Sequence, residues 1–428
     1  MNKRLWIPFF TFGLLMACSS APSLAHFEAH ELEQIETDAY RPSPVPDRII
    51  MNLSGDPAIE RAVNWRTDND NEVPLAQIAI ADGSPDQESR AATLTGRTKV
   101  MDAGDYLSYH HRVRFKDLAP DMLYVYRVGD GQVWSEWMQF RTASAEPAPF
   151  SFIYFGDAQN DLKSRWSRVA RQAYSDMPKA DFILHAGDLV NDPESDQEWG
   201  QWFYAAGWIN GSIPSIATPG NHEYEGLKLS KQWRPHFTLP KNGPDNSELT
   251  ETVYYVDYQG TRFISLNTQA MTIDPFVKTI QQKEWLEEVL ENNPNRWTVI
   301  FHHHPMLPAT EDRTGHAMLN LYFKVLYEKY NVDLVLQGHD HSYARGDNLS
   351  IGGTWLGRQS PVYVVSVSGP KMYAGGASWA DVNGKDTQLY QLLDVDHDRI
   401  CYRSYRADGT LFDQFVLAKD AQGNRTVE

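Results

Sequence analysis

The segment Phe150-Ser-Phe-Ile-Tyr-Phe-Gly-Asp157 is a short apolar run that ends in a glycine and a carboxylate. Apolar runs of this length, bounded by turn residues, are typical of buried strands. Glycine lets the chain turn sharply where the strand ends, which directs the following Asp157 side chain away from the strand. The same pattern recurs where Phe182-Ile-Leu-His-Ala-Gly187 is followed by Asp188.

Three further motifs with metal-binding side chains follow apolar runs farther along the chain. They are Gly220-Asn221-His222-Glu223, His302-His303-His304-Pro305 and Gly338-His339-Asp340-His341. Carboxylate and amide oxygens, combined with imidazole nitrogens, suit two adjacent metal ions of hard or borderline character. The candidate metal ligands are Asp157, Asp188, Asn221, His303, His339 and His341. A single aspartate or histidine of this kind would be unremarkable, but five motifs at five strand ends favour a metal centre.

Apolar strand patterns alternate with helical patterns between residues 150 and 420, which predicts an α/β domain. Strands are expected at 150–155, 181–185, 213–217, 262–266, 297–301, 332–336 and 362–367. Helices are expected at 164–176, 281–291 and 319–330. Ligands bind at the carboxyl ends of the strands in open α/β sheets, so the five motifs are expected to meet at one edge.

Residues 47–144 have a different pattern, which predicts an all-β sandwich. Short runs such as Arg48-Ile-Ile-Met-Asn-Leu53 and His111-Arg-Val-Arg-Phe115 are strand-like, and turn residues separate them. The run from Leu118 to Val128 resembles the last third of fibronectin-III domains, in which a Leu-x-Pro turn precedes a Tyr-rich strand. A Pro- and Ala-rich linker separates this domain from the α/β domain.

The chain has 428 residues, and 42% of them are hydrophobic, which is enough to form a sizeable core. The net charge of -17 argues against nucleic-acid binding by bulk electrostatic attraction. It does not argue against a phosphorylated small-molecule substrate, because bound cations can dominate the local field. The sequence does not indicate an oligomeric state.

The N-terminus has the pattern of an export signal. Lys3 and Arg4 precede a mostly apolar run that is too short to span a membrane. Leu15-Met-Ala-Cys18 resembles a bacterial lipobox, which predicts a signal peptide over 1–18, lipidation of Cys18 and a tether over 19–46. The alternative is an ordinary signal peptide cleaved later, after Ala25. The chain is therefore expected to be lipid-anchored to a bacterial membrane, or periplasmic or extracellular.

The order of the five motifs resembles that of the calcineurin-like dinuclear metallophosphoesterases, and most closely that of the purple acid phosphatases. The resemblance covers roughly residues 47 to 420, and plant-type purple acid phosphatases also carry an N-terminal domain of this kind. It implies a metallophosphoesterase sandwich with two metal ions, of Fe, Mn or Zn, at the strand carboxyl ends. In that arrangement Asp188 bridges the metals, Asp157 and His341 hold the first, and Asn221, His303 and His339 hold the second. His302 remains an alternative to His303.

The sequence departs from the family pattern at two positions around the first metal. Purple acid phosphatases have a tyrosine where this chain has Asn191, and other superfamily members have a histidine where this chain has Gln159. A carbonyl oxygen of Gln159 or Asn191, or a water molecule, would fill the vacant position. We therefore expect no tyrosinate-to-iron colour band, and the oxygen-rich first site leaves the identity of the metal open.

The resemblance implies an acid phosphatase-like enzyme that hydrolyses phosphate monoesters with a metal-activated hydroxide. His222 is the first candidate for the acid or transition-state stabiliser, and His316 is the second. His304 and Tyr224 are candidates for substrate contacts, or they pack at the strand end and in a loop. One alternative is a phosphodiesterase that uses the same site. Another, from a different class, is a non-catalytic surface binding protein.

Overall fold

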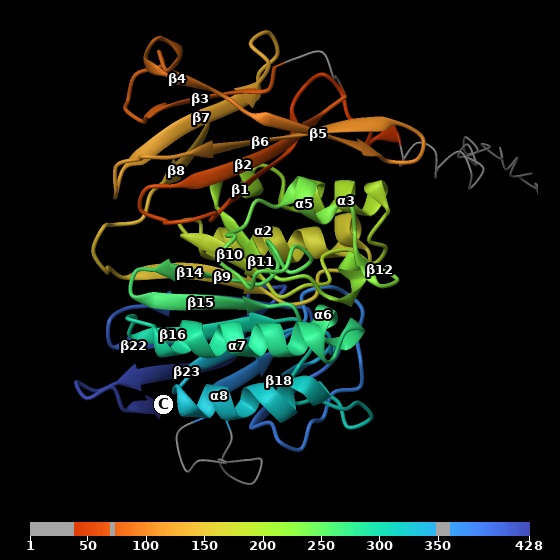
Figure 1. Ribbon diagram of the computed structural model, residues 1–428, viewed down its shortest axis with the longest axis vertical. Coiled ribbons are helices and arrows are strands. Elements are labelled where there is room, and N and C mark those ends of the chain that lie inside the picture. The colour runs from red at the N-terminus through yellow and green to blue at the C-terminus, as the bar shows by residue number, and fades with distance from the viewer. Residues whose placement is uncertain (1–37, 69–72, 348–359) are drawn as a thin grey trace, which may run out of the picture. The chain divides into compact units, whose positions relative to one another are not determined.

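The computed structural model describes residues 38–68, 73–347 and 360–428 (Figure 1). The chain divides into residues 1–41 and one compact unit of residues 42–428. The signal peptide, Cys18 and most of the tether that the sequence predicts lie outside the described residues. Among the described residues, no helix combines the length and the apolar character needed to cross a membrane.

Two antiparallel sheets form an N-terminal β-sandwich, which confirms the predicted all-β domain. One sheet contains β1 (Asp47–Asn52), β2 (Arg61–Thr67), β6 (Leu107–Phe115) and β5 (Arg97–Asp102). The other contains β4 (Ala92–Thr95), β3 (Leu75–Ile80), β7 (Leu123–Gly129) and β8 (Met138–Arg141). Trp65, Phe115, Tyr126 and Phe140 are buried between them. The rings of Phe115 and Tyr126, from facing sheets, meet edge to face at 5.8 Å.

The α/β domain contains two sheets. The first has β9 (Phe150–Phe155), β10 (Phe182–His185), β11 (Ser215–Ala217), β21 (Leu389–Val395), β22 (Arg399–Arg406), β23 (Leu411–Lys419) and β24 (Arg425–Val427). The second has β14 (Tyr254–Tyr258), β15 (Thr261–Leu266), β16 (Trp297–His302), β17 (Leu334–Gln337), β18 (Tyr343–Gly346), β19 (Val362–Val365) and β20 (Val382–Gly384). Phe152 and Phe182 of the first sheet contact Phe263 of the second at 5.3 and 5.1 Å, so the two sheets pack face to face.

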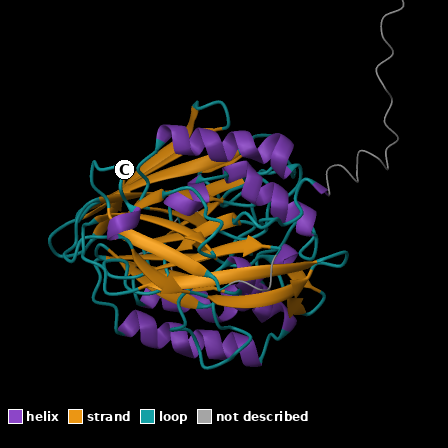
Figure 2. Ribbon diagram, turned by 90° about the horizontal axis from the view of Figure 1, so that it is seen from above, coloured by secondary structure: helices purple, strands orange, loops and turns teal. Residues whose placement is uncertain are grey.

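Helices cover the outer faces of this pair of sheets (Figure 2). They are α2 (Ser167–Asp176), α3 (Asp196–Ala206), α4 (Ile209–Ser212), α5 (Trp233–His236), α6 (Thr268–Ile273), α7 (Val277–Glu291) and α8 (Lys324–Lys329). Leu286 of α7 and Leu326 of α8 are buried against the second sheet. Helix α3 begins at Ser195, whose side chain accepts a hydrogen bond from the Glu198 N–H, the S-x-x-E pattern of a helix start.

The β-sandwich and the α/β domain share a sheet, which the sequence does not predict. Strand β1 pairs in parallel with β11 through Asn52 and Ser215, and the Leu53 N–H donates to the Ser215 carbonyl at 3.3 Å. One eleven-stranded sheet therefore runs from β24 through β9, β10 and β11 into β1, β2, β6 and β5. The β-sandwich is therefore continuous with the first sheet of the α/β domain and is not joined to it by a linker alone.

Candidate dinuclear metal centre

Parallel strands bring the five motifs to one edge of the domain. Strands β9, β10 and β11 are parallel neighbours in the first sheet, and β15, β16 and β17 are parallel neighbours in the second. The carboxyl ends of neighbouring parallel strands meet at the same edge. The residues that follow those ends are Asp157 after β9, Asp188 after β10, Asn221 and His222 after β11, His303 after β16, and His339 and His341 after β17.

Asp157, Asp188 and His341 form a first group of ligands. One ligand atom from each lies within 4.8 Å of the others. His341 Nδ1 is 2.9 Å from the Lys371 carbonyl, which accepts hydrogen bonds only, so this nitrogen carries the proton. The other ring nitrogen, His341 Nε2, lies 3.3 Å from Asp157 Oδ2. In metal sites, a hydrogen bond from one ring nitrogen, here Nδ1 to the Lys371 carbonyl, orients the histidine so that the other nitrogen can bind the metal.

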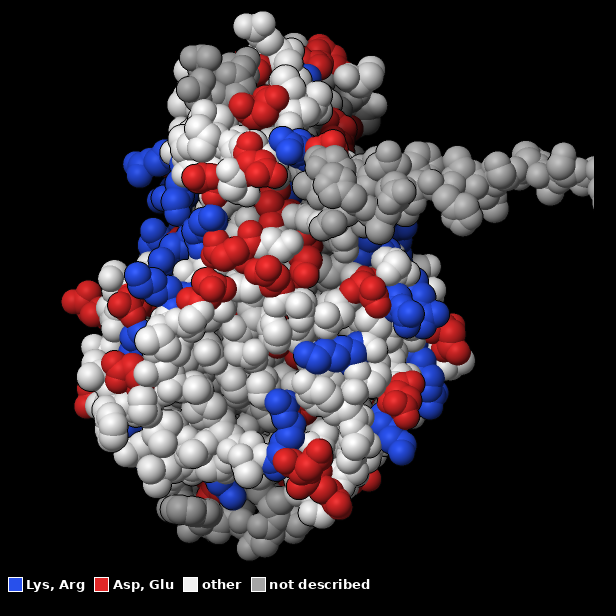
Figure 3. Space-filling model, turned by 90° about the vertical axis from the view of Figure 1, so that its right-hand side faces the viewer, with Lys and Arg blue, Asp and Glu red and all other residues white. Residues whose placement is uncertain are grey.

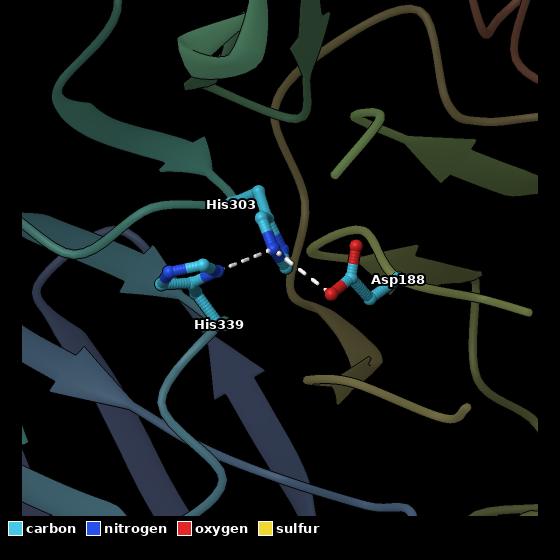
Figure 4. A group of neighbouring side chains, drawn as sticks. All are labelled: Asp188, His303 and His339. Atoms are coloured by element: carbon cyan, nitrogen blue, oxygen red, sulfur yellow. Dashed lines mark hydrogen bonds and ion pairs between the residues drawn. The ribbon is translucent and has the colours of Figure 1, made fainter. Parts of the chain in front are cut away.

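Asp188, His303 and His339 form a second group (Figure 4). Asn221 lies beside this group. His303 Nε2 lies 3.2 Å from Asp188 Oδ2 and 3.1 Å from His339 Nδ1. Asn221 Oδ1 is 3.1 Å from His303 Nε2 and 2.9 Å from His339 Nδ1. His303 Nδ1 donates to the Ala186 carbonyl at 3.0 Å, so its Nε2 lone pair faces the other ligands.

Asp188 belongs to both groups, which is the position of a bridging ligand. Its φ angle is +51°, so the backbone turns sharply as β10 ends. Asp157 Oδ2 is buried and has no hydrogen-bond donor among the described residues. A buried carboxylate oxygen without a donor is costly unless a cation neutralises it. The donor set therefore fits two metal ions, one at each group.

Glycines allow the motif loops to approach each other closely. Gly187 has a φ of +89°, and a Cβ there would lie 2.6 Å from the Gly220 nitrogen. A Cβ on Gly220 would lie 2.1 Å from Asp188 Oδ1. Any larger residue at these two positions would push apart the loops that carry Asp188 and Asn221.

Gln159 occupies the position where the family has a histidine. Its amide nitrogen is 2.9 Å from His341 Nε2 and 3.2 Å from Asp188 Oδ2, while its Oε1 is buried without a partner. A half turn of the amide exchanges the two atoms and directs Oε1 at the first group. The geometry thus favours Gln159, rather than Asn191, as the oxygen ligand predicted for the first metal.

Asn191 contributes its backbone to another residue of the site. Its carbonyl accepts a hydrogen bond from His222 Nδ1 at 2.6 Å, and its N–H donates to Glu198 Oε2. Among the described residues, no hydrogen bond connects the Asn191 side chain to a ligand. The His222 backbone N–H donates to Asp188 Oδ1 at 2.8 Å, which holds this half-buried histidine beside the centre.

The other predicted residues take different positions. His302 Nδ1 donates to the His304 carbonyl, and His302 belongs to neither ligand group, so the geometry favours His303 over His302 as the ligand. The His304 ring lies 4.3 Å from the His339 ring, and its Nδ1 is 2.9 Å from Thr268 Oγ1. Its half-buried ring therefore borders the second group.

His316 and Tyr224, two candidates for catalysis or substrate contact, contact residues outside the two ligand groups. His316 packs edge-on against His304 at 5.4 Å, its Nε2 is 2.9 Å from Thr272 Oγ1, and burial lowers its pKa. Tyr224 is 9% exposed, and its hydroxyl accepts a hydrogen bond from Asn267, the residue that caps α6. Tyr224 is therefore used in packing, one of the two roles expected for it, and the catalytic role expected for the half-buried His316 stays a prediction.

Glu223 is a positioning residue that the sequence analysis missed. It is fully buried, and its carboxylate accepts hydrogen bonds from the backbone N–H groups of Asp188, Leu189 and Gly220 at 2.7 to 2.8 Å. Burial and the neighbouring Asp188 carboxylate raise the pKa of Glu223 to about 8. One side chain thus connects the loop after β10 to the loop after β11. The one sequence feature that could have indicated this role is the position of Glu223 directly after the candidate site residues Asn221 and His222.

Substituting Glu223 with glutamine is expected to weaken metal binding by about 10–100-fold, because partners that orient ligands contribute that much. Glutamine replaces one acceptor oxygen with an amide nitrogen, which is a donor. At least one backbone N–H that Glu223 accepts would then face another donor and lose its hydrogen bond. Metal affinity measured by competition with a fluorescent chelator tests this. Glu225→Gln, at an exposed position two residues away, is the matched control and is expected to match the unsubstituted protein. Equal metal affinity in both variants would contradict the positioning role.

A cationic rim borders the first group, and the sequence analysis did not identify it. Arg313 donates to the His339 carbonyl at 3.1 Å and to Asp340 Oδ1 at 2.6 Å, and its side chain is 34% exposed. Its guanidinium lies 4.9 Å from the centre of the Tyr373 ring, which itself lies 4.6 Å from the His341 ring. Arg313 adds a fixed positive charge beside the metal ligands. Arg313 lies in an irregular loop, and the sequence analysis missed it because a loop has no periodic pattern from which the direction of a side chain can be predicted.

Two family models match the chain. The model described as calcineurin-like phosphoesterase matches residues 150–343, and the purple acid phosphatase N-terminal domain matches residues 46–142. Human "Acid phosphatase type 7" is 29% identical over 331 residues, covering 71% of each chain. "Probable inactive purple acid phosphatase 1" of Arabidopsis thaliana is 22% identical over 373 residues, covering 73% of this chain and 58% of that protein.

The fold also matches a solved purple acid phosphatase, PPD1 from yellow lupin seeds. The TM-score is 0.72 at 18% identity, and the match covers 89% of this chain and 75% of the lupin chain. The fold and the site therefore define a calcineurin-like metallophosphoesterase domain that follows a purple acid phosphatase N-terminal domain. Within that class the chain is a purple acid phosphatase-like phosphoester hydrolase with a candidate dinuclear metal centre.

Proposed function

We propose that this chain hydrolyses phosphate monoesters at the dinuclear centre, as an acid phosphatase-like enzyme. The observation that carries the proposal is the position of Asp188, which is shared by two groups of buried ligands. The names of the acid phosphatase relatives support monoesters as the substrate class. The cationic Arg313 at the rim suits an anionic substrate.

Two bound metal ions would supply an acidified water molecule and neutralise the charge on the phosphate oxygens. The chain's own residues hold and orient the reacting groups. Because His222 Nδ1 donates to the Asn191 carbonyl, Nε2 is the ring nitrogen available to a substrate. In its protonated form, His222 donates the Nε2 proton to the leaving oxygen and becomes neutral while Nδ1 keeps its hydrogen bond. The position of the His304 ring beside His339 supports a role for His304 in contacting a phosphate oxygen.

The test of this proposal compares two esters after metal exchange. The purified protein is stripped with chelator, restored with Mn²⁺, Zn²⁺ or Fe²⁺ singly, and assayed with p-nitrophenyl phosphate and with its bis-ester. We expect metal-dependent turnover that favours the monoester. Preference for the bis-ester would favour a phosphodiesterase instead. Inactivity with every metal and both esters would favour a non-catalytic binding protein, which the relative named as probably inactive makes a concrete alternative.

We propose further that the chain is exported and lipid-anchored at Cys18. The support is the sequence alone: two basic residues, an apolar run and Leu15-Met-Ala-Cys18. Cys18→Ala is expected to move the protein from the membrane fraction to the soluble fraction of an expressing bacterium, and mass spectrometry of the mature N-terminus should find a lipidated cysteine. An unmodified N-terminus after Ala25 would instead favour a periplasmic or extracellular protein.

A further inference from the structure

A positively charged cleft lies between the β-sandwich and the α/β domain, on residues that hold none of the metal ligands. One wall is formed by β5 and β6, and the other by the chain around α5 and Lys241. It consists of two adjoining cavities of about 670 and 430 Å³ that share Arg97, Arg112 and Lys241. We call this the cationic cleft, defined by Arg97, Lys99, Arg112, Lys116 and Lys241.

Most of these cations lack a counter-charge. The side chains of Arg97, Lys99, Arg112 and Lys116 make no hydrogen bond or ion pair with a described residue. Lys241 lies 3.7 Å from Glu251, which is a loose ion pair. Because the chain as a whole carries a net charge of -17, a concentration of unpaired positive charge in one cleft is unexpected and calls for an explanation.

Strand register places these charges on one face. Arg97 is directly opposite Arg112 in the β5–β6 pair, and Lys99 is opposite His110. Alternate residues of a strand share a face, so Arg97 and Lys99 point the same way. The face is the one toward the α/β domain, because the His110 ring lies 5.1 Å from the His236 ring of α5. Like charges directly opposite each other destabilise a sheet.

Arg114 and Arg234 also line the cleft, as do two carboxylates, Glu60 and Glu251. Desolvation, followed by the charges of Arg234 and Arg112, lowers the pKa of Lys99. Glu60, which also borders the cleft, is already paired with Arg114 at 2.6 Å. In Figure 3, Lys and Arg side chains gather on the left of the view, at the level where the β-sandwich meets the α/β domain. An anion bound there would relieve the repulsion.

We propose that the cationic cleft binds a small anion that carries several phosphate groups. Each of its two cavities falls within the size range of small-molecule sites, about 300–1,000 Å³. Guanidinium groups match phosphate oxygens in pairs, and lysines add point charges. Five cations spread over two adjoining cavities fit two or more linked phosphates better than one. The proposal is independent of the catalytic function, because the cleft and the metal centre have no residue in common.

Calorimetric titration of the metal-stripped protein with inorganic tripolyphosphate tests the proposal. The metals are removed because tripolyphosphate could otherwise bind to metal ions at the dinuclear centre. We expect one bound tripolyphosphate per chain, with orthophosphate binding at least ten times more weakly. Arg97→Gln combined with Arg112→Gln is expected to weaken tripolyphosphate binding at least tenfold, and to flatten its salt dependence because fewer counterions are exchanged.

Lys179→Gln combined with Lys385→Gln removes the same amount of charge from exposed positions outside the cleft, and it is expected to leave binding unchanged. The arginine variant should melt at the same or a higher temperature than the unsubstituted protein, since it removes a like-charge pair. Equal affinity of both double variants for tripolyphosphate, or equal affinity for orthophosphate and tripolyphosphate, would overturn the proposal. Tighter binding of a single-stranded oligonucleotide or of anionic lipid vesicles than of tripolyphosphate would overturn the choice of a small molecule.

Discussion

Asp188→Ala is expected to lower kcat for p-nitrophenyl phosphate by at least about 10²–10³-fold, the effect of losing a single stabilising contact. The reason is geometric: Asp188 is the one residue that belongs to both ligand groups. Its loss removes the charge that holds two cations near each other, and the backbone N–H of His222 loses its acceptor at the same time. Metal content, measured by plasma mass spectrometry, should fall from two ions to one or none per chain.

Asp245→Ala is the matched control for this experiment, because Asp245 is exposed and lies outside both ligand groups. It should retain both metals and full turnover. A circular dichroism spectrum and melting temperature for each variant separate loss of the site from loss of the fold. An Asp188→Ala protein that kept two metal ions and its turnover would contradict the bridging position.

Asp196→Ala is expected to reduce the free energy of unfolding by about 3–5 kcal/mol, the cost of breaking a buried ion pair. Asp196 of α3 forms ion pairs with Arg48 at 2.7 Å and with Arg66 at 2.9 Å, and both arginines lie on strands of the β-sandwich. Tyr106 and Gln232 also donate to its carboxylate. The side chains of Arg48 and Arg66 are almost fully buried. Two guanidinium groups would therefore lose their shared partner, and urea denaturation at neutral pH measures the loss.

The same residue predicts an acid dependence. Burial opposes ionisation of Asp196, but Arg48 and Arg66 outweigh it and hold the pKa of this carboxyl far below its usual range. Asp196 therefore contributes its full stability above the unfolded pKa, near 4, and progressively less as pH falls below that value toward its folded pKa. The gap between the unsubstituted protein and Asp196→Ala should shrink between pH 5 and 3.

Asp47→Ala is the control for burial, because Asp47 pairs with the same Arg66 at a more exposed position. Asp47 pairs with Arg66 at 2.6 Å, but its side chain is 38% exposed. Solvent screens this pair, so we expect a loss of about 1 kcal/mol or less. Equal losses in Asp47→Ala and Asp196→Ala would show that burial does not determine the effect.

The strands that carry the ligands were predictable because each is apolar and ends in a turn residue. The expected strand at 150–155 coincides with β9, and 297–301 differs from β16 by one residue. Strand β5 was missed because all of its residues except Met101 are exposed, so it has no apolar alternation. The antiparallel strands β21 to β23 were missed although they form much of the first sheet. Long-range pairing, rather than a local pattern, defines them.

The candidate metal ligands were predictable for a similar reason, since each follows closely after the end of an apolar strand. Glu223 and Arg313 could not be found in this way. The role of Glu223 depends on backbone N–H groups contributed by two separate loops. The role of Arg313 depends on a carbonyl of a loop that follows β17. Tyr224 shows the converse, because a polar aromatic residue in a loop can be used in packing.

The pairing of β1 with β11 has a consequence for the way this chain is made. Residues 47–141 contain every strand of the β-sandwich, so this part can collapse as soon as it emerges during synthesis. Strand β1 then carries an unpaired edge until Ser215 arrives, and exposed edges of this kind attract other chains. The nascent protein is therefore most prone to self-association in the interval between completing its first domain and completing β11.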